Sequence, residues 1–390
     1  MKIINSSNKC VGCFSCVYTC PVKAIILKAD KEGFLYPLVD ENRCVNCLKC
    51  QKACPLNAKN ENVNRDSEIK KQAFVVQNKD QAVRGKSSSG GAFSLLADYV
   101  LNKNGVVFGA KFEEGEIIHC KAENKDELNV LRGSKYCQSK ADYMQVKSCL
   151  EDGRMVLFAG TPCQVAGLYS FLGKVYENLY TMDFVCHGVG SPKVFKLYCD
   201  FMEKKYKSKI AELSFRDKKY GYASSSMSVT FANGKKKISS KWIKSYKKLY
   251  FSGLISRPSC YDCKFKTTNF LADFRVYDCW HVNVYDKSMD DDKGTSYIVF
   301  NDRVSGMVKD VLADSLNKEI DFLQALKTDG KMMTESDNAN ENREVFFDKL
   351  DKLGYKKCIN KFVKYTFKDF MGNYIKPFIY KTGLIKWIKR

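Results

Sequence analysis

The sequence predicts an α+β module over residues 1–58, followed by an α/β domain that begins at residue 72. Two cysteine runs, at residues 10–20 and 44–54, repeat each other within the first part. Two later stretches share a strand–loop–helix plan, which is typical of a parallel α/β sheet. The chain has 390 residues, 45% of them hydrophobic, which is enough for two or three domains with sizeable cores.

Each cysteine run has the form C-x-x-C-x-x-C-x-x-x-C-P. This is the spacing of bacterial two-cluster ferredoxins, in which three cysteines wrap one 4Fe-4S cluster and the fourth ligates the other. The module is therefore expected to be ferredoxin-like and to carry two clusters. The expected ligand sets are Cys10, Cys13, Cys16 and Cys54 for one cluster, and Cys44, Cys47, Cys50 and Cys20 for the other.

Two other uses of these cysteines stay open. Paired C-x-x-C motifs also hold zinc in a tetrahedral site. The 18 cysteines of the chain would alternatively form a disulfide framework, although such frameworks are typical of much shorter secreted domains. The first residues, "MKIINSSNKC", lack the apolar stretch of a secretory signal, so we expect a cytoplasmic protein with reduced cysteines.

The chain is strongly basic, with a formal net charge of +21. Three clusters on twelve thiolates would lower this value to about +15. Such a surface favours acidic partners: a ferredoxin or flavodoxin, an anionic substrate or anionic lipid. The lysine clusters at 234–237 and 241–248 belong to no recognisable nucleic-acid-binding fold, so we expect no nucleic acid partner.

Composition also marks a linker and a tail. Residues 59–71 lie in a polar, asparagine-rich stretch without apolar periodicity and are expected to be a linker. Residues 326–390 are expected to form a helical, basic extension. Within it, residues 364–390 interleave lysines with aromatic and aliphatic side chains, a pattern that fits peripheral contact with the inner membrane surface or packing against a protein.

The sequence "GKSSSGGAF" follows a short apolar run of strand type at residues 73–77 and opens a helix. A serine- and glycine-rich loop at a helix N-terminus offers free backbone N–H groups to a phosphate. The loop lacks the lysine–serine or lysine–threonine pair of a Walker motif, and a plain helix cap is the alternative.

Cysteines follow two predicted strands directly. Cys163 comes after a strand at Met155–Ala159, and Cys186 comes after a strand near Leu179–Val185. Parallel sheets build their sites at the carboxyl edge of the strands. The sequence "RPSCYDCKF" adds Cys260 and Cys263; a lone C-x-x-C fits zinc, a cluster or a redox dithiol. Together the four cysteines suffice for a third 4Fe-4S cluster.

Six motifs occur in order: "KSSSGGAF", "GSKYCQS", "AGTPCQVAGL", "DFVCHGVGSPKVF", "RPSCYDCKFK" and "ADFRVYDCW". They resemble the beta subunit of coenzyme F420-reducing hydrogenases and dehydrogenases over roughly residues 72–305. The resemblance implies an FAD- and iron–sulfur-dependent oxidoreductase, with residues 72–160 as the N-terminal part of the FAD domain. Residues 161–325 would be its C-terminal part and would hold the third 4Fe-4S cluster on Cys163, Cys186, Cys260 and Cys263.

The same resemblance implies the residues of the flavin region: Ser88, Ser89, Gly90, Gly91, Ser134, Lys135, Tyr136, Gln138 and Ser139. Lys135 is the candidate catalytic cation near the isoalloxazine, with a solvated surface lysine as the alternative. His187 is the candidate proton donor, although it more simply orients its loop. Residues 272–282 depart from the family pattern, with Arg275, Tyr277, Cys279 and His281 in place of other groups.

The expected function is electron relay between a low-potential carrier (ferredoxin, NAD(P)H or deazaflavin) and an organic acceptor. By resemblance, that acceptor belongs to surface-polysaccharide metabolism. The alternative is an electron-transfer subunit that has no substrate site of its own and docks a partner oxidoreductase or transferase.

Overall fold

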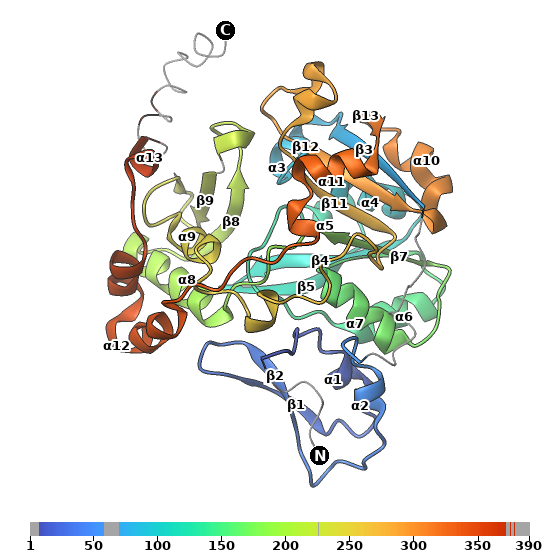
Figure 1. Ribbon diagram of the computed structural model, residues 1–390, viewed down its shortest axis with the longest axis horizontal. Coiled ribbons are helices and arrows are strands. Elements are labelled where there is room, and N and C mark those ends of the chain that lie inside the picture. Colours follow the sequence, from blue (N-terminus) through green and yellow to red (C-terminus); the bar gives the residue numbers. More distant parts are fainter. Residues whose placement is uncertain (1–7, 58–69, 225, 372–374, 376–377, 379–390) are drawn as a thin grey trace.

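Figure 1 shows the computed structural model of the chain. It describes residues 8–57, 70–224, 226–371, 375 and 378. The expected linker at 59–71 and the tail at 364–390 fall largely outside these ranges, and both remain predictions. None of the helices within the described ranges is long and apolar enough to cross a membrane.

The N-terminal module consists of a small sheet and two short helices. Strand β1 (Ile25–Ala29) pairs antiparallel with β2 (Leu35–Val39). Helix α1 (Ser15–Thr19) begins within the first cysteine run, and helix α2 (Lys49–Lys52) begins within the second. The module is thus a mixed α+β unit, as the sequence predicts.

The two cysteine loops have the same backbone path. The residue directly after the second cysteine of each run is left-handed, with φ of 65° at Phe14 and 61° at Leu48. Two residues after the first cysteine, Gly12 (φ 68°) and Asn46 (φ 54°) are left-handed as well. Non-glycine residues seldom adopt this conformation. Its recurrence at matching positions indicates that both loops are shaped to enclose the same type of ligand.

The second part of the chain is built on an eight-stranded mixed sheet in the order β13-β3-β12-β11-β7-β6-β4-β5. Four adjacent strands, β11, β7, β6 and β4, run parallel; three antiparallel strands extend the sheet beyond β11 and one extends it beyond β4. The strand bounds are β3 (Lys71–Asn78), β4 (Val106–Glu113), β5 (Glu116–Ala122), β6 (Val156–Ala159), β7 (Leu179–Phe184), β11 (Phe274–Cys279), β12 (Thr295–Asn301) and β13 (Ser315–Ile320).

Helices cover both faces of this sheet (Figure 1). One hydrophobic core lies under α4 (Ala92–Leu101), α5 (Lys125–Leu128) and α10 (Val308–Leu312). The other lies under α6 (Tyr143–Glu151), α7 (Pro162–Leu172) and α11 (Phe322–Asp329). Helix α3 (Gln81–Lys86) follows β3. The sheet combines strands from 72–160 and from 161–325, so these two ranges share their cores.

A second lobe surrounds a three-stranded sheet in the order β10-β9-β8. Its strands are β8 (Ile210–Asp217), β9 (Ser226–Phe231) and β10 (Lys236–Ile238). Its helices are α8 (Pro192–Tyr206), α9 (Ser245–Phe251), α12 (Arg343–Phe362) and α13 (Phe367–Phe370). The 3-10 helices of the chain are Tyr222–Ser224, Pro258–Cys260, Val282–Val284, Lys287–Met289, Asp302–Met307 and Lys331–Met333.

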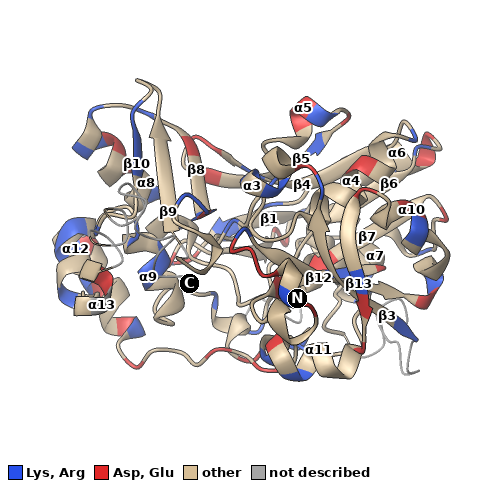
Figure 2. Ribbon diagram, turned by 90° about the horizontal axis from the view of Figure 1, so that it is seen from above, with Lys and Arg blue, Asp and Glu red and all other residues tan. Residues whose placement is uncertain are grey.

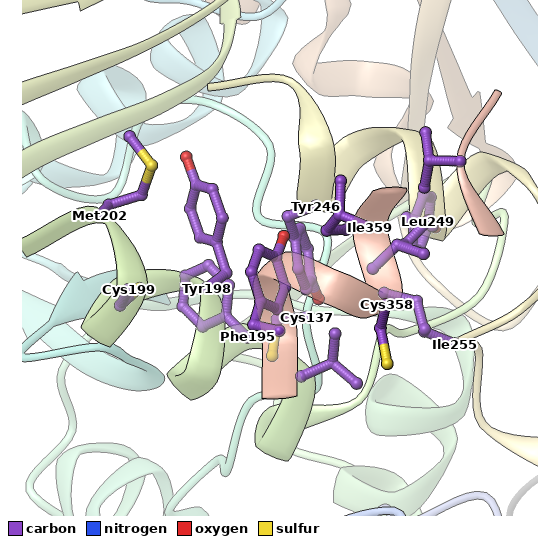
Figure 3. Close-up of a cluster of buried hydrophobic side chains, with 14 of the residues drawn as sticks. Cys137, Phe195, Tyr198, Cys199, Met202, Tyr246, Leu249, Ile255, Cys358 and Ile359 are labelled. Atoms are coloured by element: carbon purple, nitrogen blue, oxygen red, sulfur yellow. The ribbon is translucent and has the colours of Figure 1, made fainter. Parts of the chain in front are cut away.

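Three cysteines are packed in the core of this lobe. Figure 3 shows Cys137, Cys199 and Cys358 among the aromatic and aliphatic side chains of α8, α9 and α12. Burial raises the pKa of the Cys137 thiol to about 12, so this thiol stays protonated at neutral pH. These residues are structural thiols, as expected for cysteines outside the ligand sets.

The local elements predicted for the body are confirmed. The apolar run at 73–77 lies in β3, and the strands expected before Cys163 and Cys186 are β6 and β7. Ser191 caps helix α8, where its hydroxyl accepts a hydrogen bond from the Val194 amide. The helix after β6 begins at Pro162, slightly earlier than expected, because Thr161 and Gln164 form a capping box.

The N-terminal module docks on the body through buried polar contacts. Arg257 is fully buried and donates from Nε to the Cys10 carbonyl at 2.7 Å. Arg343 forms an ion pair with Glu32 in the turn between β1 and β2. The ring of Tyr18, on α1, packs against the core under α6 and α7. The module is therefore fixed on the body at three separate points.

Candidate functional site

The structure brings the cysteines of the two N-terminal runs into the crossed sets that the spacing predicts. Cys54 of the second run lies close to Cys10, Cys13 and Cys16 of the first. These four cysteines are near enough that a thiolate on one would repel a thiolate on another. Conversely, Cys20 of the first run lines one small cavity with the remaining three cysteines. That cavity is walled by Cys20, Cys44, Cys47 and Cys50.

The third set of cysteines also converges. Cys163 lies in the first turn of α7, Cys186 follows β7, and Cys260 and Cys263 come from the loop after α9. All four line a single cavity at the carboxyl edge of the sheet. The strand ends placed Cys163 and Cys186 at this edge, the resemblance added Cys260 and Cys263 to the set, and the structure brings all four together.

The chemistry of this donor set suits an iron–sulfur cluster. Burial raises the pKa of Cys186 to about 11 and that of Cys260 to about 12, and the opposing effects of Lys266 and Arg257 are smaller, so both thiols stay protonated unless more positive charge is supplied. Iron supplies that charge and draws out the proton. The Gly188 amide donates to Cys186 Sγ at 3.3 Å, and Cys163 sits at a positive helix N-terminus. Both features stabilise thiolates.

The three cysteine sets form a continuous series. Cys16 of the first set lies close enough to Cys50 of the second for their charges to interact. Val11, next to Cys10, lines the cavity of the third set, and Cys13 lies against Gly167 of α7. No three His, Cys, Asp or Glu side chains in the part of the chain that the structure describes are grouped tightly enough for a single metal ion.

A cavity of about 670 Å³, here called the large cavity, adjoins the third set. Thr161, Cys186 and Met332 line both spaces. Aromatic rings wall the large cavity, among them Tyr136 and Tyr250, which stack at 4.9 Å between centroids. Its volume lies in the range typical of cofactor and ligand sites.

Known families match two parts of the chain. Residues 153–322 match the family described as the C terminus of the coenzyme F420 hydrogenase/dehydrogenase beta subunit. Over these residues the chain is similar to that family. Residues 9–58 match the 4Fe-4S dicluster domain family. The beta-subunit family and the dicluster domain together make the chain an iron–sulfur oxidoreductase with an electron-transfer module.

One solved structure is similar to this chain. It belongs to a xenon derivative of the F420-reducing nickel–iron hydrogenase complex from Methanosarcina barkeri. The two share 14% sequence identity, and the superposition covers 75% of this chain and 97% of that chain, with a TM-score of 0.46. No curated protein matches the chain.

Most residues proposed for the flavin region line the large cavity. They are Ser88, Ser89, Gly91, Ser134, Lys135, Tyr136 and Ser139. Gly91 caps α4 with φ of 92°, so the first turn of this ten-residue helix opens at the cavity. Free N–H groups and the positive end of the helix there favour a phosphate.

Gly90 and Gln138 do not line the large cavity. Gly90 packs inside the sheet, where an added Cβ would lie 2.2 Å from the Val76 carbonyl oxygen. Gln138 instead faces the N-terminal module, and its Oε1 accepts a hydrogen bond from Arg257 Nη1 at 3.1 Å. Neither residue lines the large cavity, and their place in the flavin region stays a prediction.

The two proposed catalytic residues lie at the large cavity in different settings. The Lys135 amine donates to the carbonyls of Val130, Leu131 and Arg132, at 2.8–3.1 Å. Burial lowers the pKa of Lys135 to about 7. His187 lines the cavity next to Cys186, with Nδ1 3.7 Å from the Asp337 carboxylate. The structure thus ties Lys135 to a turn and leaves His187 partly exposed.

Sequence reasoning missed His119 and Arg216, which line the large cavity. These two residues and Tyr277 each place a buried polar atom there, and these atoms lack a hydrogen-bond partner among the described residues. Burial lowers the pKa of His119 to about 4, so its ring is neutral. Unsatisfied buried polar atoms are rare in proteins. These atoms therefore fit a cavity that holds a polar cofactor.

The residues at 272–282 that depart from the family pattern form one buried ion pair and one contact whose histidine is exposed. Arg275 forms a two-pronged pair with Asp183 at 2.6–2.7 Å, and both side chains are almost completely buried. His281 Nδ1 lies 2.7 Å from the Asp329 carboxylate, which lines the large cavity. These residues join β11 to β7 and to α11, so their first role is to fix the cavity wall.

Proposed function

We propose that this chain is an FAD-dependent iron–sulfur oxidoreductase that exchanges electrons between a one-electron carrier and an organic substrate. The observation that carries the proposal is the continuous series of three four-cysteine sets that ends at the large cavity. A bound 4Fe-4S cluster takes up one electron at a time and a bound flavin two, so such cofactors link one-electron carriers to two-electron chemistry.

The chain's own residues supply position and charge. Cys10, Cys13, Cys16 and Cys54, then Cys20, Cys44, Cys47 and Cys50, and finally Cys163, Cys186, Cys260 and Cys263 would hold the three clusters. The first turn of α4 and the serines before it would bind the diphosphate of FAD, and Tyr136 with Tyr250 would form an aromatic wall. His119 and Tyr277 would pair their unsatisfied polar atoms with the cofactor.

We propose an acidic electron carrier such as ferredoxin or flavodoxin as partner of the N-terminal module. The loop that holds Cys44 and Cys47 points away from the body, and Val45 and Leu48 on it are 60% and 40% exposed. Lysines follow directly on α2. Exposed apolar side chains ringed by basic groups fit a small acidic protein that docks briefly.

The experiment is an anaerobic preparation of the full chain with metal and flavin analysis. We expect about twelve iron atoms per chain and a flavin spectrum. The Cys163→Ala variant should lose about four iron atoms and keep the other eight or so, since it lacks one cysteine ligand of the third set. Zinc in place of iron, or a preparation without flavin, would refute the proposal.

A pure electron-transfer subunit is the second candidate, because the matched family is that of a beta subunit. Such a subunit would act only when a partner oxidoreductase or transferase is present. Diaphorase activity of the isolated chain with NAD(P)H or deazaflavin as donor would decide against it. The large cavity favours a chain with its own substrate, and a sugar- or nucleotide-linked acceptor of surface-polysaccharide metabolism is the candidate class.

A further inference from the structure

A second cavity of about 580 Å³, here called the basic cavity, adjoins the large cavity. It lies between α3, the loop at 129–135 and strand β8. Figure 2 shows the elements around it from above, with Lys and Arg in blue. Ser134, Lys135 and Arg216 line both cavities. A ligand in the basic cavity can therefore extend into the large one.

The basic cavity carries a clear excess of positive charge. Nine of its lining side chains are Lys or Arg, and three are Asp or Glu. Three of the cations are already paired with carboxylates: Arg84 with Asp291, Arg216 with Asp278 and Lys236 with Asp217. The remaining cations outnumber the remaining carboxylates. A concave surface of one sign concentrates ligands of the opposite sign.

Arg216 supplies an observation that points directly to a ligand. Its side chain is 92% buried, with a relative exposure of 8%. Nη1 donates to Asp278 at 2.8 Å, and the guanidinium lies over the stacked rings of Trp280 and Tyr222. Nη2 is buried and has no hydrogen-bond partner in the described part of the chain. A guanidinium that is held in place and has one nitrogen free to donate is suited to binding a phosphate oxygen.

Lys218 is held in place beside Arg216, where burial lowers its pKa to about 7, so a bound anion would favour its charged form. Its Nζ donates to the carbonyls of Arg84 and Lys293 at 2.7–2.8 Å and also to that of Ser89. These bonds connect the loop that contains Ser89, which lines the large cavity, to the end of β8. Lys219 and Lys293 are exposed at the rim of the basic cavity. The cavity thus has a fixed cationic floor and a basic entrance.

We propose that the basic cavity binds the diphosphate of a nucleotide-linked substrate whose reacting end reaches into the large cavity. This inference rests on the proposed function, because it assigns the substrate class of the same oxidoreductase. The diphosphate of FAD itself has the same chemistry. The serines and the first turn of α4 that we assign to FAD, however, line the large cavity and not the basic one, apart from the shared Ser134.

The test measures binding of ADP and inorganic pyrophosphate to the anaerobic holoprotein by titration calorimetry. Arg216→Lys keeps the positive charge next to Asp278 but removes the unpaired Nη2 group. Lys219→Glu with Lys293→Glu reverses the charge of the rim. Lys352→Glu with Lys356→Glu on α12 is the matched control, because these lysines are exposed and do not line the basic cavity. Flavin content and melting temperature are recorded for every variant.

We expect both probes to bind, and both cavity variants to weaken binding about tenfold or more while they keep flavin and melting temperature. The control should bind like the wild type. Unchanged affinity in the cavity variants, or equal loss in the control, would overturn the proposal. Loss of flavin in the cavity variants would also overturn it, since the basic cavity would then hold FAD. A preparation with no flavin at all refutes the proposed function separately.

Discussion

Replacement of Arg257 by methionine should separate the N-terminal module from the body. Arg257 is the side chain that connects them most closely: its relative exposure is 0%. It donates to the Cys10 carbonyl at 2.7 Å, to Gln138 Oε1 at 3.1 Å and to the Leu35 carbonyl at 3.1 Å. Methionine fills a similar volume but donates no hydrogen bond.

The magnitude follows from these three bonds. A hydrogen bond from a charged donor contributes about 1.5–3 kcal/mol. The Cys10 carbonyl keeps a second donor, the Ser259 hydroxyl at 3.0 Å. The loss of its hydrogen bond from Arg257 is therefore partly compensated. The other two acceptors stay buried without that donor. We therefore expect the docking of the module to weaken by about 3–5 kcal/mol.

The assay is urea unfolding of the anaerobic holoprotein, followed by iron–sulfur absorbance for the module and by tryptophan fluorescence for the body. The two transitions should coincide in the wild type and separate in the Arg257→Met variant. A redox titration should shift the N-terminal clusters to lower potential, because a nearby cation stabilises their reduced, more negative form.

Arg343→Met is the control for this experiment. It removes the ion pair with Glu32, on the far side of the turn between β1 and β2, and leaves the contacts of Cys10 intact. The control should weaken docking as well but leave the cluster potential unchanged. If Arg257→Met unfolds in one transition at the wild-type midpoint, the reasoning from buried hydrogen bonds is wrong.

Three further variants test the body of the chain. Gly90→Ala should lower the melting temperature and the flavin content, since its Cβ would lie 2.2 Å from a carbonyl oxygen of β3; Gly85→Ala, with open space around it, should have neither effect. Arg275→Met should destabilise the fold by about 3–5 kcal/mol in urea, because it leaves the buried Asp183 carboxylate unpaired. Burial lowers the pKa of Lys247 to about 7, so the unfolded chain binds one more proton between pH 7 and about 10. Lys247 should therefore make stability rise with pH in that window by up to about 1.4 kcal/mol per pH unit, and Lys247→Met should lower the measured slope by this amount relative to the wild type.

Spacing alone was sufficient to predict the crossed sets of the N-terminal cysteines. The pattern is local, and its geometry follows from the size of a cubane cluster. The strand ends at Cys163 and Cys186 were predictable for a similar reason, since apolar strands of a parallel sheet end at a common edge. In both cases, short segments determine where the side chains lie.

The polar atoms of the large cavity were not predictable in this way. His119 and Arg216 lie on strands of different sheets, and nothing in their neighbouring residues shows that they meet at one space. The resemblance placed Gln138 at the flavin, whereas the structure turns it toward the N-terminal module. A short motif shows which residues occur together, but which side of a loop faces a cavity depends on the packing of distant elements.

The packing of the module also decides which cysteine set an electron carrier can reach. The set with Cys13 lies against α7 and beneath Arg257, where the body covers it. Cys47 of the other set is exposed on the outer loop. A protein carrier can approach only the outer set, while only the inner set borders the cavity of Cys163. If the module held a single cysteine set, that set would have to contact the body and also be accessible to a partner. With two cysteine runs, one set contacts the body and the other is accessible.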